Sequence, residues 1–279
     1  MKAETGNVDD ATVDAFGVEW SRFDQSLLSD EERQEIFDQY FSLFPWRRVG
    51  PDAVGFDLGC GSGRWARLAA PRVRRLHCVD ASPAALDVAR RHLRDVPNCE
   101  FHLAQVDRMP FPDNSMDFGY SLGVLHHVPD TRAAIASSVR KLKPGAPFLA
   151  YLYYAFDNRP PWFRFLWRAS DTVRRVVARL PAKVRICVAD VIALSVYWPC
   201  ARMALVLERL GLRAHLWPLS AYRRRSFYLM RTDALDRFGT RLEQRFTRTE
   251  IKEMLEAAGL TDVAFRESPP YWCAIGFKR

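Results

Sequence analysis

Short apolar runs alternate with amphipathic stretches over the first half of the chain. The run VGFDL at 54–58 is apolar almost throughout, which is typical of a strand buried on both faces. Stretches with helical spacing follow these runs, and Ser82 with Pro83 suits the start of one of them. We predict strands at 54–58, 76–79, 99–103, 116–121 and 147–154, and helices at 63–70, 83–95 and 131–142. Strands that alternate with helices pair in parallel, so this pattern predicts an α/β sheet.

The two ends of the chain extend this pattern. Residues 1–12 are polar, and we expect them to be disordered. A helix is predicted over 29–43, because a serine and three acidic residues open it and a proline follows it. Thr247 and Glu250 fit a capping box at the start of a later helix that ends at Gly259. Residues 262–267 and 272–278 are the last two predicted strands.

The regular alternation stops between Phe156 and Gly239. Aromatic side chains at 162–167 lie among arginines, and a helix is predicted over 174–180. Residues 184–200 are apolar apart from two charged residues, and Pro199 interrupts the run. Seventeen residues of this kind are marginal for a membrane span. We favour a buried helix, with an interfacial amphipathic helix as the alternative and a membrane span as the third interpretation.

Charge and cysteine content change this picture in two ways. Residues 156–231 carry 15 Lys/Arg and 4 Asp/Glu, a net charge of +11, so the rest of this +8 chain is near neutral at −3. The six cysteines are scattered without a CxxC pair, which indicates neither a disulfide framework nor a metal site. No charged start followed by an apolar segment is present in the sequence, so we expect a cytoplasmic protein with reduced thiols.

The first predicted strand continues into a glycine-rich turn, DLGCGSG. Gly59, Gly61 and Gly63 permit positive φ and let a ligand approach the backbone closely. Asp80 is the next acidic residue at a predicted strand end, 21 residues after Gly59, and its carboxylate can accept hydrogen bonds from both hydroxyls of a ribose. The glycine turn and the acidic strand end together indicate a nucleotide-binding edge of the sheet.

Four motifs in order resemble those of the class I S-adenosylmethionine (SAM) dependent methyltransferases: DLGCGSG, VDAS, MPFPDNSMDFGYSLGVLHHVPD and LKPGAPFLA. The resemblance runs from Val54 to Tyr151 and resumes near Thr247. It implies a seven-stranded, Rossmann-like doubly wound sheet with a mainly helical insertion after the fifth strand. The implied parts are an N-terminal helical and aromatic cover (1–46), a SAM-binding core (47–155), a basic and apolar insertion that caps the substrate (156–240) and the C-terminal part of the core (241–279).

The resemblance implies SAM as the cofactor and places its contacts at the ends of the strands. The backbone N–H groups of residues 59–63 would face the methionyl part, Asp57 would reach the ammonium group, and Asp80 would bind the ribose. The aromatic residues Trp20 and Phe23 either fold over the cofactor or pack on the sheet. The cofactor-binding residues expected in this way are Asp57, Gly59, Cys60, Gly61, Gly63, Asp80, Ala81, Gln105, Val106, Asp107, Ser121 and Leu122.

The adenine position departs from the pattern D-A-x-x-L-P-F of the resembling enzymes. Aligning residues 109–111 with L-P-F puts Gln105 where the pattern has Asp, and Val106 then supplies the backbone N–H for the ring. A slipped register would use Asp107 instead. We favour Gln105 with Val106 on this spacing, because an amide oxygen can also accept a hydrogen bond from adenine N6.

His126 and His127 are the candidate catalytic residues. Both follow the fourth predicted strand, where an imidazole could take the proton that a hydroxyl or amine acceptor must lose. The pair HH before V-P-D also recurs in the resembling fold irrespective of the acceptor, which favours a structural role such as a bond to a loop carbonyl. The sequence leaves both interpretations open.

The function expected from the resemblance is methyl transfer from SAM to a small or amphipathic acceptor. O-methylation is favoured, and S-, N- and C-methylation remain open. Peripheral membrane contact through the insertion is an expected partner interaction. The alternative is a nucleic-acid or protein methyltransferase that uses the basic insertion. We do not favour nucleic acid, because no N-P-P-Y-like motif follows the fourth strand and the insertion is too apolar for a phosphate-tracking groove. A third class is a SAM-binding protein without catalysis.

Overall fold

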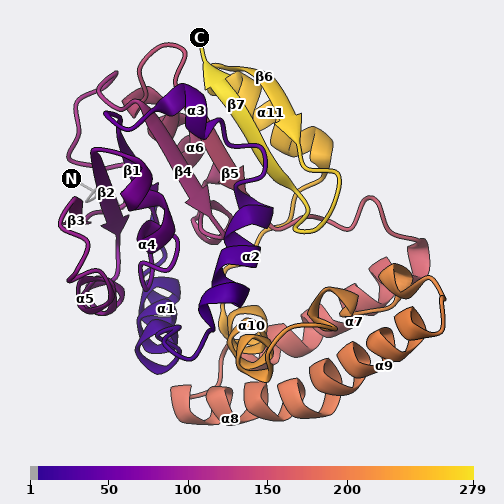
Figure 1. Cartoon of the computed structure of the whole chain (residues 1–279). Coiled ribbons are helices and arrows are strands. Elements are labelled where there is room, and N and C mark those ends of the chain that lie inside the picture. Colours follow the sequence, from indigo (N-terminus) through magenta and orange to yellow (C-terminus); the bar gives the residue numbers. More distant parts are fainter. Residues whose placement is uncertain (1–5) are drawn as a thin grey trace, which may run out of the picture. The chain divides into compact units, whose positions relative to one another are not determined.

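The computed structural model describes residues 6–279, so residues 1–5 of the stretch expected to be disordered lie outside the described residues. A seven-stranded sheet with the order β3-β2-β1-β4-β5-β7-β6 forms the centre of the fold (Figure 1). Neighbouring strands among the first five pair in parallel, and β7 lies antiparallel between β5 and β6. The strands are β1 (Val54–Leu58), β2 (Arg75–Asp80), β3 (Cys99–Leu103), β4 (Phe118–Leu122), β5 (Pro147–Tyr151), β6 (Leu260–Phe265) and β7 (Cys273–Lys278).

Helices complete the layers around this sheet. One core cluster joins apolar residues of β1, β2 and β5 to Ile135 of α6 and to Ile251 and Leu255 of α11, so these two helices share one layer. The helices outside the central insertion are α1 (Asp10–Arg22), α2 (Asp30–Tyr40), α3 (Trp46–Val49), α4 (Ala66–Ala69), α5 (Pro83–His92), α6 (Thr131–Lys141) and α11 (Arg248–Ala257), with 3₁₀ turns η1 (Ala70–Arg72) and η2 (Leu125–His127).

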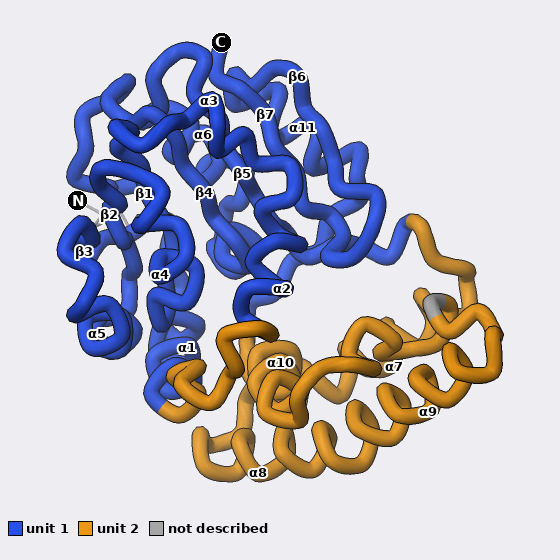
Figure 2. The backbone as a smooth tube through the Cα atoms, in the orientation of Figure 1, with its two compact units in different colours: residues 1–21, 33–157, 242–279 blue, residues 22–32, 158–241 orange. Residues whose placement is uncertain are grey.

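The chain divides into two compact units, which Figure 2 colours separately. Unit 1 contains the sheet and comprises residues 1–21, 33–157 and 242–279. Unit 2 comprises residues 22–32 and 158–241. The longer segment of unit 2 corresponds closely to the insertion predicted at 156–240, whereas its shorter segment lies in the stretch that the sequence analysis assigned to an N-terminal cover.

Unit 2 is mainly helical. Its helix α10 packs against α7 and α8, and Met230, Ala234 and Phe238 of α10 share a core cluster with Val177 and Ala193. The elements of its longer segment are α7 (Pro161–Val177), α8 (Ala182–Ile192), the π-helical turn η3 (Ala193–Tyr197), α9 (Trp198–Arg209), the 3₁₀ turns η4 (Ala214–Leu216) and η5 (Ser220–Tyr222), and α10 (Phe227–Gly239).

The run 182–209 corrects two expectations. The helix continues through Pro199, because Pro199 sits in the first turn after the π-helical turn, where a wider turn accommodates the missing N–H. This run is long and apolar enough for a membrane span by length and composition, but only 28% of its most apolar window is buried. The prediction of a buried helix was therefore wrong for its outer face.

Most predicted elements of unit 1 are observed with small shifts. The strands at 54–58 and 99–103 and the capping box of Thr247 and Glu250 are confirmed. The predicted helix at 63–70 is shorter, because the glycine turn continues to residue 65 and a 3₁₀ turn with Pro71 follows α4. Disorder was a wrong expectation for residues 10–12, because Asp9 accepts a hydrogen bond from Thr12 N at 2.8 Å and opens α1.

Candidate functional site

The carboxyl ends of β1, β2 and β4 meet at one edge of the sheet. Asp57 of β1 is paired in register with Cys78 of β2 on one side and with Tyr120 of β4 on the other. Loops that leave parallel strands at such an edge form the ligand-binding crevice of open α/β sheets. The register therefore brings Asp57, the glycine turn and Asp80 together, as the spacing of the sequence predicts.

Asp57 is a buried carboxylate, and the charge of Arg64 lowers its pKa less than burial raises it. Its side chain is 1% exposed, and Oδ2 accepts no hydrogen bond from the described residues. Burial raises the pKa of Asp57 to about 8, although the neighbouring Tyr120 hydroxyl lowers it, and Asp80 raises it further. A ligand that brings an ammonium group to Oδ2 would satisfy this oxygen and favour its ionised form.

The glycine turn holds itself together more than the sequence analysis expected. Gly59 and Cys60 both donate their N–H groups to Val79 O, at 2.7 and 3.1 Å, and Gly63 N donates to Cys60 O at 2.9 Å. Gly61 N donates to Asp80 Oδ2 at 2.9 Å. The prediction that the N–H groups of residues 59–63 face the methionyl part of SAM was therefore wrong for Gly59, Cys60, Gly61 and Gly63, because the turn and the adjacent strand already use these four groups. For Ser62 it stays a prediction.

The glycines of this turn allow other groups to approach its backbone closely. Gly61 has a φ of +54°, and a Cβ on it would lie 2.8 Å from the ring of Trp20. Trp20 belongs to α1, and the guanidinium of Arg64 lies 5.4 Å from the centre of its ring. Trp20 thus lies against the glycine turn, and its contact with the cofactor stays a prediction. Phe23 instead packs in unit 2 against Ala189 and Leu235.

Asp80 ends β2 with its carboxylate held in a fixed direction. Oδ2 accepts from Gly61 N at 2.9 Å, and Oδ1 accepts from Ser82 N at 2.8 Å. Burial raises the pKa of Asp80, and the N–H groups of Ser82, Gly61 and Ala81 oppose this rise. Each oxygen retains a lone pair, so a diol can still donate to both. The ribose assignment to Asp80 fits this geometry.

Both adenine candidates present a buried acceptor after β3. Gln105 Oε1 and Asp107 Oδ1 each lack a hydrogen-bond donor among the described residues. Asp107 Oδ2 accepts from the N–H of Asn7 at 3.2 Å. Val106, which was expected to supply a backbone N–H, has a buried side chain in the core cluster. Gln105 and Asp107 each offer a buried oxygen that could accept a hydrogen bond from adenine N6, so the structure does not decide between them.

Ser121 and Leu122 have different roles in the structure. The Ser121 hydroxyl donates to Leu58 O at 2.9 Å and so ties β4 to β1. This bond uses its only hydroxyl proton, so the side chain of Ser121 could offer a ligand only an acceptor. Leu122 is the last residue of β4 and is 7% exposed. Both remain at the strand end where the resemblance places the sulfonium.

His126 and His127 lie in η2, directly after β4, and carry their protons on different nitrogens. His126 Nδ1 accepts from Tyr153 N at 3.4 Å, so its proton is on Nε2. His127 Nδ1 donates to Leu242 O at 2.7 Å, which leaves a lone pair on Nε2. Burial lowers the pKa of His126 well below its usual value, and the neighbouring His127 adds to this effect. The ring of Phe16 in α1 lies edge-on to His127 at 4.9 Å.

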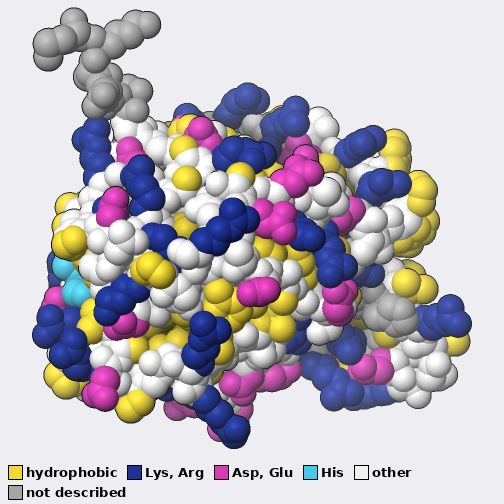
Figure 3. All heavy atoms as spheres, turned by 90° about the horizontal axis from the view of Figure 1, so that it is seen from above, with side chains coloured by type: hydrophobic (Ala, Val, Ile, Leu, Met, Phe, Trp, Pro, Cys, Tyr) yellow, Lys and Arg dark blue, Asp and Glu magenta, His cyan; other side chains and the backbone are white. Residues whose placement is uncertain are grey.

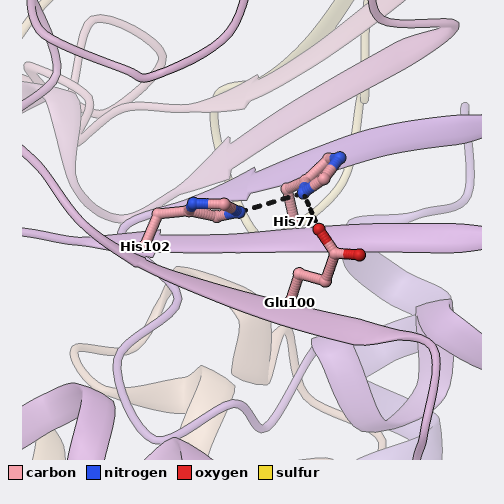
Figure 4. Close-up of side chains that lie close together, drawn as sticks. All are labelled: His77, Glu100 and His102. Carbon is pink, nitrogen blue, oxygen red and sulfur yellow. Dashed lines mark hydrogen bonds and ion pairs between the residues drawn. The ribbon is translucent and has the colours of Figure 1, made fainter.

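A group of possible metal ligands that the sequence analysis missed lies along β2 and β3 (Figure 4). His77 Nδ1 is 3.0 Å from His102 Nε2 and 3.3 Å from Glu100 Oε2. Burial lowers the pKa of both histidines. Two imidazoles and a carboxylate suit zinc, but Glu100 also pairs with Arg75 at 3.1 Å. The strand register, which pairs His77 with Glu100, is the signal that could have found them.

The orphan acceptors of the site fit SAM in particular. Its ammonium group would meet Asp57, its ribose hydroxyls would meet Asp80, and its adenine amine would meet Gln105 or Asp107. Each of these carboxylate or amide groups lies at the same edge of the sheet, and Asp57, Gln105 and Asp107 have a buried oxygen that accepts no hydrogen bond from the described residues. The residues present therefore match the donors that SAM carries.

Comparison with known proteins agrees with this site. Residues 56–150 match the family model described as "Methyltransferase domain". A malonyl-[acyl-carrier protein] O-methyltransferase of Serratia marcescens is 34% identical over 125 residues, which are 45% of this chain and 47% of that protein. A demethylmenaquinone methyltransferase of Tropheryma whipplei is 24% identical over 182 residues, 62% of this chain and 74% of that protein. The chain spans less than half the length of the first curated relatives that it matches.

Solved structures share the fold across nearly the whole chain. A Haloferax volcanii methyltransferase in complex with the Trm112 methyltransferase activator has a TM-score of 0.54 at 16% identity, covering 95% of this chain and 96% of that chain. The Haemonchus contortus phosphoethanolamine N-methyltransferase 2 with bound SAM has a TM-score of 0.51 at 15% identity, covering 96% of this chain and 45% of that chain. Residues 56–150 are thus similar to the methyltransferase domain family, and the fold of the chain is that of the class I SAM-dependent methyltransferases.

Proposed function

We propose that this protein is an enzyme that transfers a methyl group from SAM to a small or amphipathic acceptor. The observation that carries this proposal is Asp57, a buried carboxylate whose Oδ2 accepts no hydrogen bond from the described residues, at the strand end beside the glycine turn. Evolved folds rarely bury such a group unless a ligand compensates it. The ammonium group of SAM is a ligand of the required charge.

The residues of the site bind and orient rather than react covalently. SAM supplies an electrophilic methyl group on a sulfonium, and the protein must align an acceptor with it and exclude water. Asp57 and Asp80 fix the two ends of the cofactor, while Trp20 and Phe16 of α1 cover the glycine turn and His127. This cover supports a site from which bulk water is excluded.

Between the two histidines, we assign the role of general base to His127. Its Nδ1 proton is held by Leu242 O, so Nε2 carries the lone pair that a base needs. His126 is neutral and accepts a hydrogen bond from Tyr153 N, so we assign it the role of positioning the loop that follows β5. Replacement of His127 by Phe should lower kcat, whereas His126→Gln should lower it less.

The acceptor atom that we propose is oxygen. The relatives include O-methyltransferases of a malonyl-acyl carrier protein and of a rifamycin, and the structure adds no feature that favours sulfur, nitrogen or carbon instead. We further propose that the protein works in the cytoplasm and makes peripheral contact with a membrane through the insertion. Cell fractionation with a tagged full-length chain tests both points.

Measurement of S-adenosylhomocysteine release tests the function itself. The full-length protein is incubated with SAM and pools of small hydroxylated, thiol and amine compounds, and product masses identify the methylated atom. Asp57→Asn should abolish turnover, and Asp87→Asn, on the exposed face of α5, serves as the matched control. Binding of SAM without any methylated small molecule, together with methylation of RNA or protein, would favour the alternative function.

A further inference from the structure

We propose that unit 2 binds the surface of an anionic phospholipid bilayer through the outward faces of α7 and of the helical run 182–209. The inference rests on the proposed function, in which the acceptor is amphipathic, and it names the surface that presents the acceptor. It depends on the distribution of apolar and charged side chains within unit 2.

Helix α7 exposes large apolar side chains and buries an ion pair. Its outward side carries Trp162 (52% exposed), Phe165 (75%), Leu166 (49%), Val173 (48%) and Val176 (59%). Its inward side buries Asp171 and Arg174, which form an ion pair at 2.6 Å. Arg174 also donates to Thr240 O at 2.9 Å. A surface helix in water normally shows the reverse arrangement, so this helix presents its apolar face to something other than water.

The run 182–209 also exposes a row of large apolar side chains. Its inward side carries the small residues Ala189, Ala193 and Ala201, which pack within unit 2. Its outward side presents six large apolar residues that are each between 45% and 68% exposed: Val184, Val191, Leu194, Trp198, Val206 and Leu210. Most of these are three or four residues apart, and the π-helical turn shifts the helical phase by one residue and keeps the later ones on the outward side.

The charge of this part of unit 2 is positive wherever it is exposed. Among the described residues from 158 to 241, every Asp and Glu is buried or partly buried. Asp190 pairs with Arg231 at 2.8 Å, and Glu208 pairs with Arg224 at 3.0 Å. Exposed cations remain on or beside the two apolar faces, among them Arg164, Arg168, Arg175, Arg179, Lys183 and Arg209. By contrast, Lys/Arg and Asp/Glu are interspersed on the face drawn in Figure 3.

A cavity near the end of α9 adds an independent sign of an anionic partner. Arg202, Arg209, Arg223 and Arg224 line it together with Leu205 and Glu208. The Nε of Arg202 is buried and has no acceptor among the described residues. A phosphate oxygen of a lipid headgroup would supply that acceptor, because guanidinium groups bind phosphate well.

These features favour a bilayer surface over a protein partner and over a membrane span. Exposed tryptophans beside cations and aliphatic side chains are typical of helices that lie in the interface of an anionic membrane. A spanning helix would have to leave α10 and separate Asp190 from Arg231, which places unpaired charges in hydrocarbon. Exposed acidic residues of unit 2 lie on its other segment, at Asp30 and Glu31.

Co-sedimentation of the full-length protein with vesicles tests this inference. We expect binding to vesicles of equal parts phosphatidylcholine and phosphatidylglycerol, weak binding to phosphatidylcholine alone, and loss of binding in high salt. The double variant Leu166→Glu/Val191→Glu should reduce partitioning about tenfold or more, because it places charges on both apolar faces. Leu103→Glu, which adds a charge at an exposed leucine of β3 in unit 1, is the matched control.

A second pair of variants separates charge from apolar insertion. Arg164→Glu/Arg168→Glu should abolish the preference for anionic vesicles, and Arg132→Glu at the exposed start of α6 should leave it unchanged. Binding of S-adenosylhomocysteine, measured by calorimetry, shows that each variant is folded. If the wild-type protein binds this ligand but no vesicle, this inference and the proposed membrane contact are wrong, whereas the proposed methyl transfer from SAM stands. Vesicle binding without ligand binding contradicts the proposed methyl transfer instead.

Two further outcomes would overturn the inference. Equal binding to neutral and anionic vesicles that the glutamate variants do not change would show non-specific adsorption. A dimer in solution that Leu166→Glu/Val191→Glu dissociates, without vesicle binding by the wild-type protein, would assign the apolar faces to a second copy of the chain.

Discussion

At the scale of single residues, we expect Asp57 to couple cofactor binding to proton release. Its pKa of about 8 in the unbound protein means that the carboxyl is mostly protonated at neutral pH. A cationic ammonium group favours the ionised form, so binding releases a proton and affinity rises as pH increases towards about 8. Well below the pKa of Asp57, the affinity for the cofactor should increase about tenfold per pH unit.

Calorimetry in buffers of different ionisation enthalpy measures this proton release directly. The Asp57→Asn variant should bind S-adenosylhomocysteine more weakly and without the proton release that Asp57 causes. A wild-type protein whose affinity does not vary with pH below about 8 would show that Asp57 does not meet the ammonium group.

Asp80 gives a second test at this scale. Its two oxygens are aimed by Gly61 N and Ser82 N, so Asp80→Ala removes a fixed acceptor for the ribose. We expect a loss of about 1.5–3 kcal/mol in the free energy of S-adenosylhomocysteine binding, the range for hydrogen bonds to charged groups. Asp87→Ala, an exposed position on α5, is the control, and an unchanged affinity of Asp80→Ala would move the ribose elsewhere.

At the scale of elements, the capping box of α11 contributes to the stability of unit 1. Thr247 Oγ1 accepts from Glu250 N at 3.2 Å, and Glu250 Oε2 accepts from Thr247 N at 2.7 Å. Thr247→Ala should lower the free energy of unfolding by about 1 kcal/mol, as measured by urea denaturation. Thr249→Ala, at an exposed position two residues further along the helix, should change the free energy of unfolding by less than about 0.5 kcal/mol. Equal effects of both substitutions would mean that the cap contributes nothing of its own.

At the same scale, helix α7 shows why most of a helix was not predicted from the sequence. The chain from 162 to 167 is rich in aromatic residues and arginines, so it was described as a cluster, and a helix was predicted only from residue 174. The helix begins at Pro161. Its apolar positions do follow helical spacing, but they face outward, and Asp171 and Arg174 occupy the inward positions where apolar residues would be expected.

At the scale of the whole molecule, cofactor binding should stabilise the fold that contains the site. A ligand present at 100 times its Kd adds about 2.7 kcal/mol to the free energy of unfolding of the part that binds it. Hydrogen exchange with and without S-adenosylhomocysteine should therefore slow around residues 57–63 and 80. The Asp80→Ala variant, at the same ligand concentration, should show less protection, and equal protection would contradict the proposed site.

Sequence patterns determined the sheet of unit 1 to within a few residues, whereas α1 and α3 were not predicted. Its strands are short apolar runs and its loops carry glycines and capping residues, so local spacing and the order of motifs define both the parallel sheet and the strand ends that bind the cofactor. Asp57, Asp80 and the adenine candidates could therefore be named in advance. The buried oxygens of Asp57, Gln105 and Asp107 that accept no hydrogen bond from the described residues could not be predicted, because this depends on which donors the folded chain already uses.

Only the tertiary structure decided three further points. The first is that N–H groups of the glycine turn donate to Val79 O, Cys60 O and Asp80. The second is that residues 22–32 belong to the same compact unit as the insertion. The third is that the apolar faces of α7 and of the run 182–209 are exposed. The physical reason is common to all three. Local spacing defines what faces an element has, whereas the partners of each face come from residues distant in the chain, and these meet only in the folded protein.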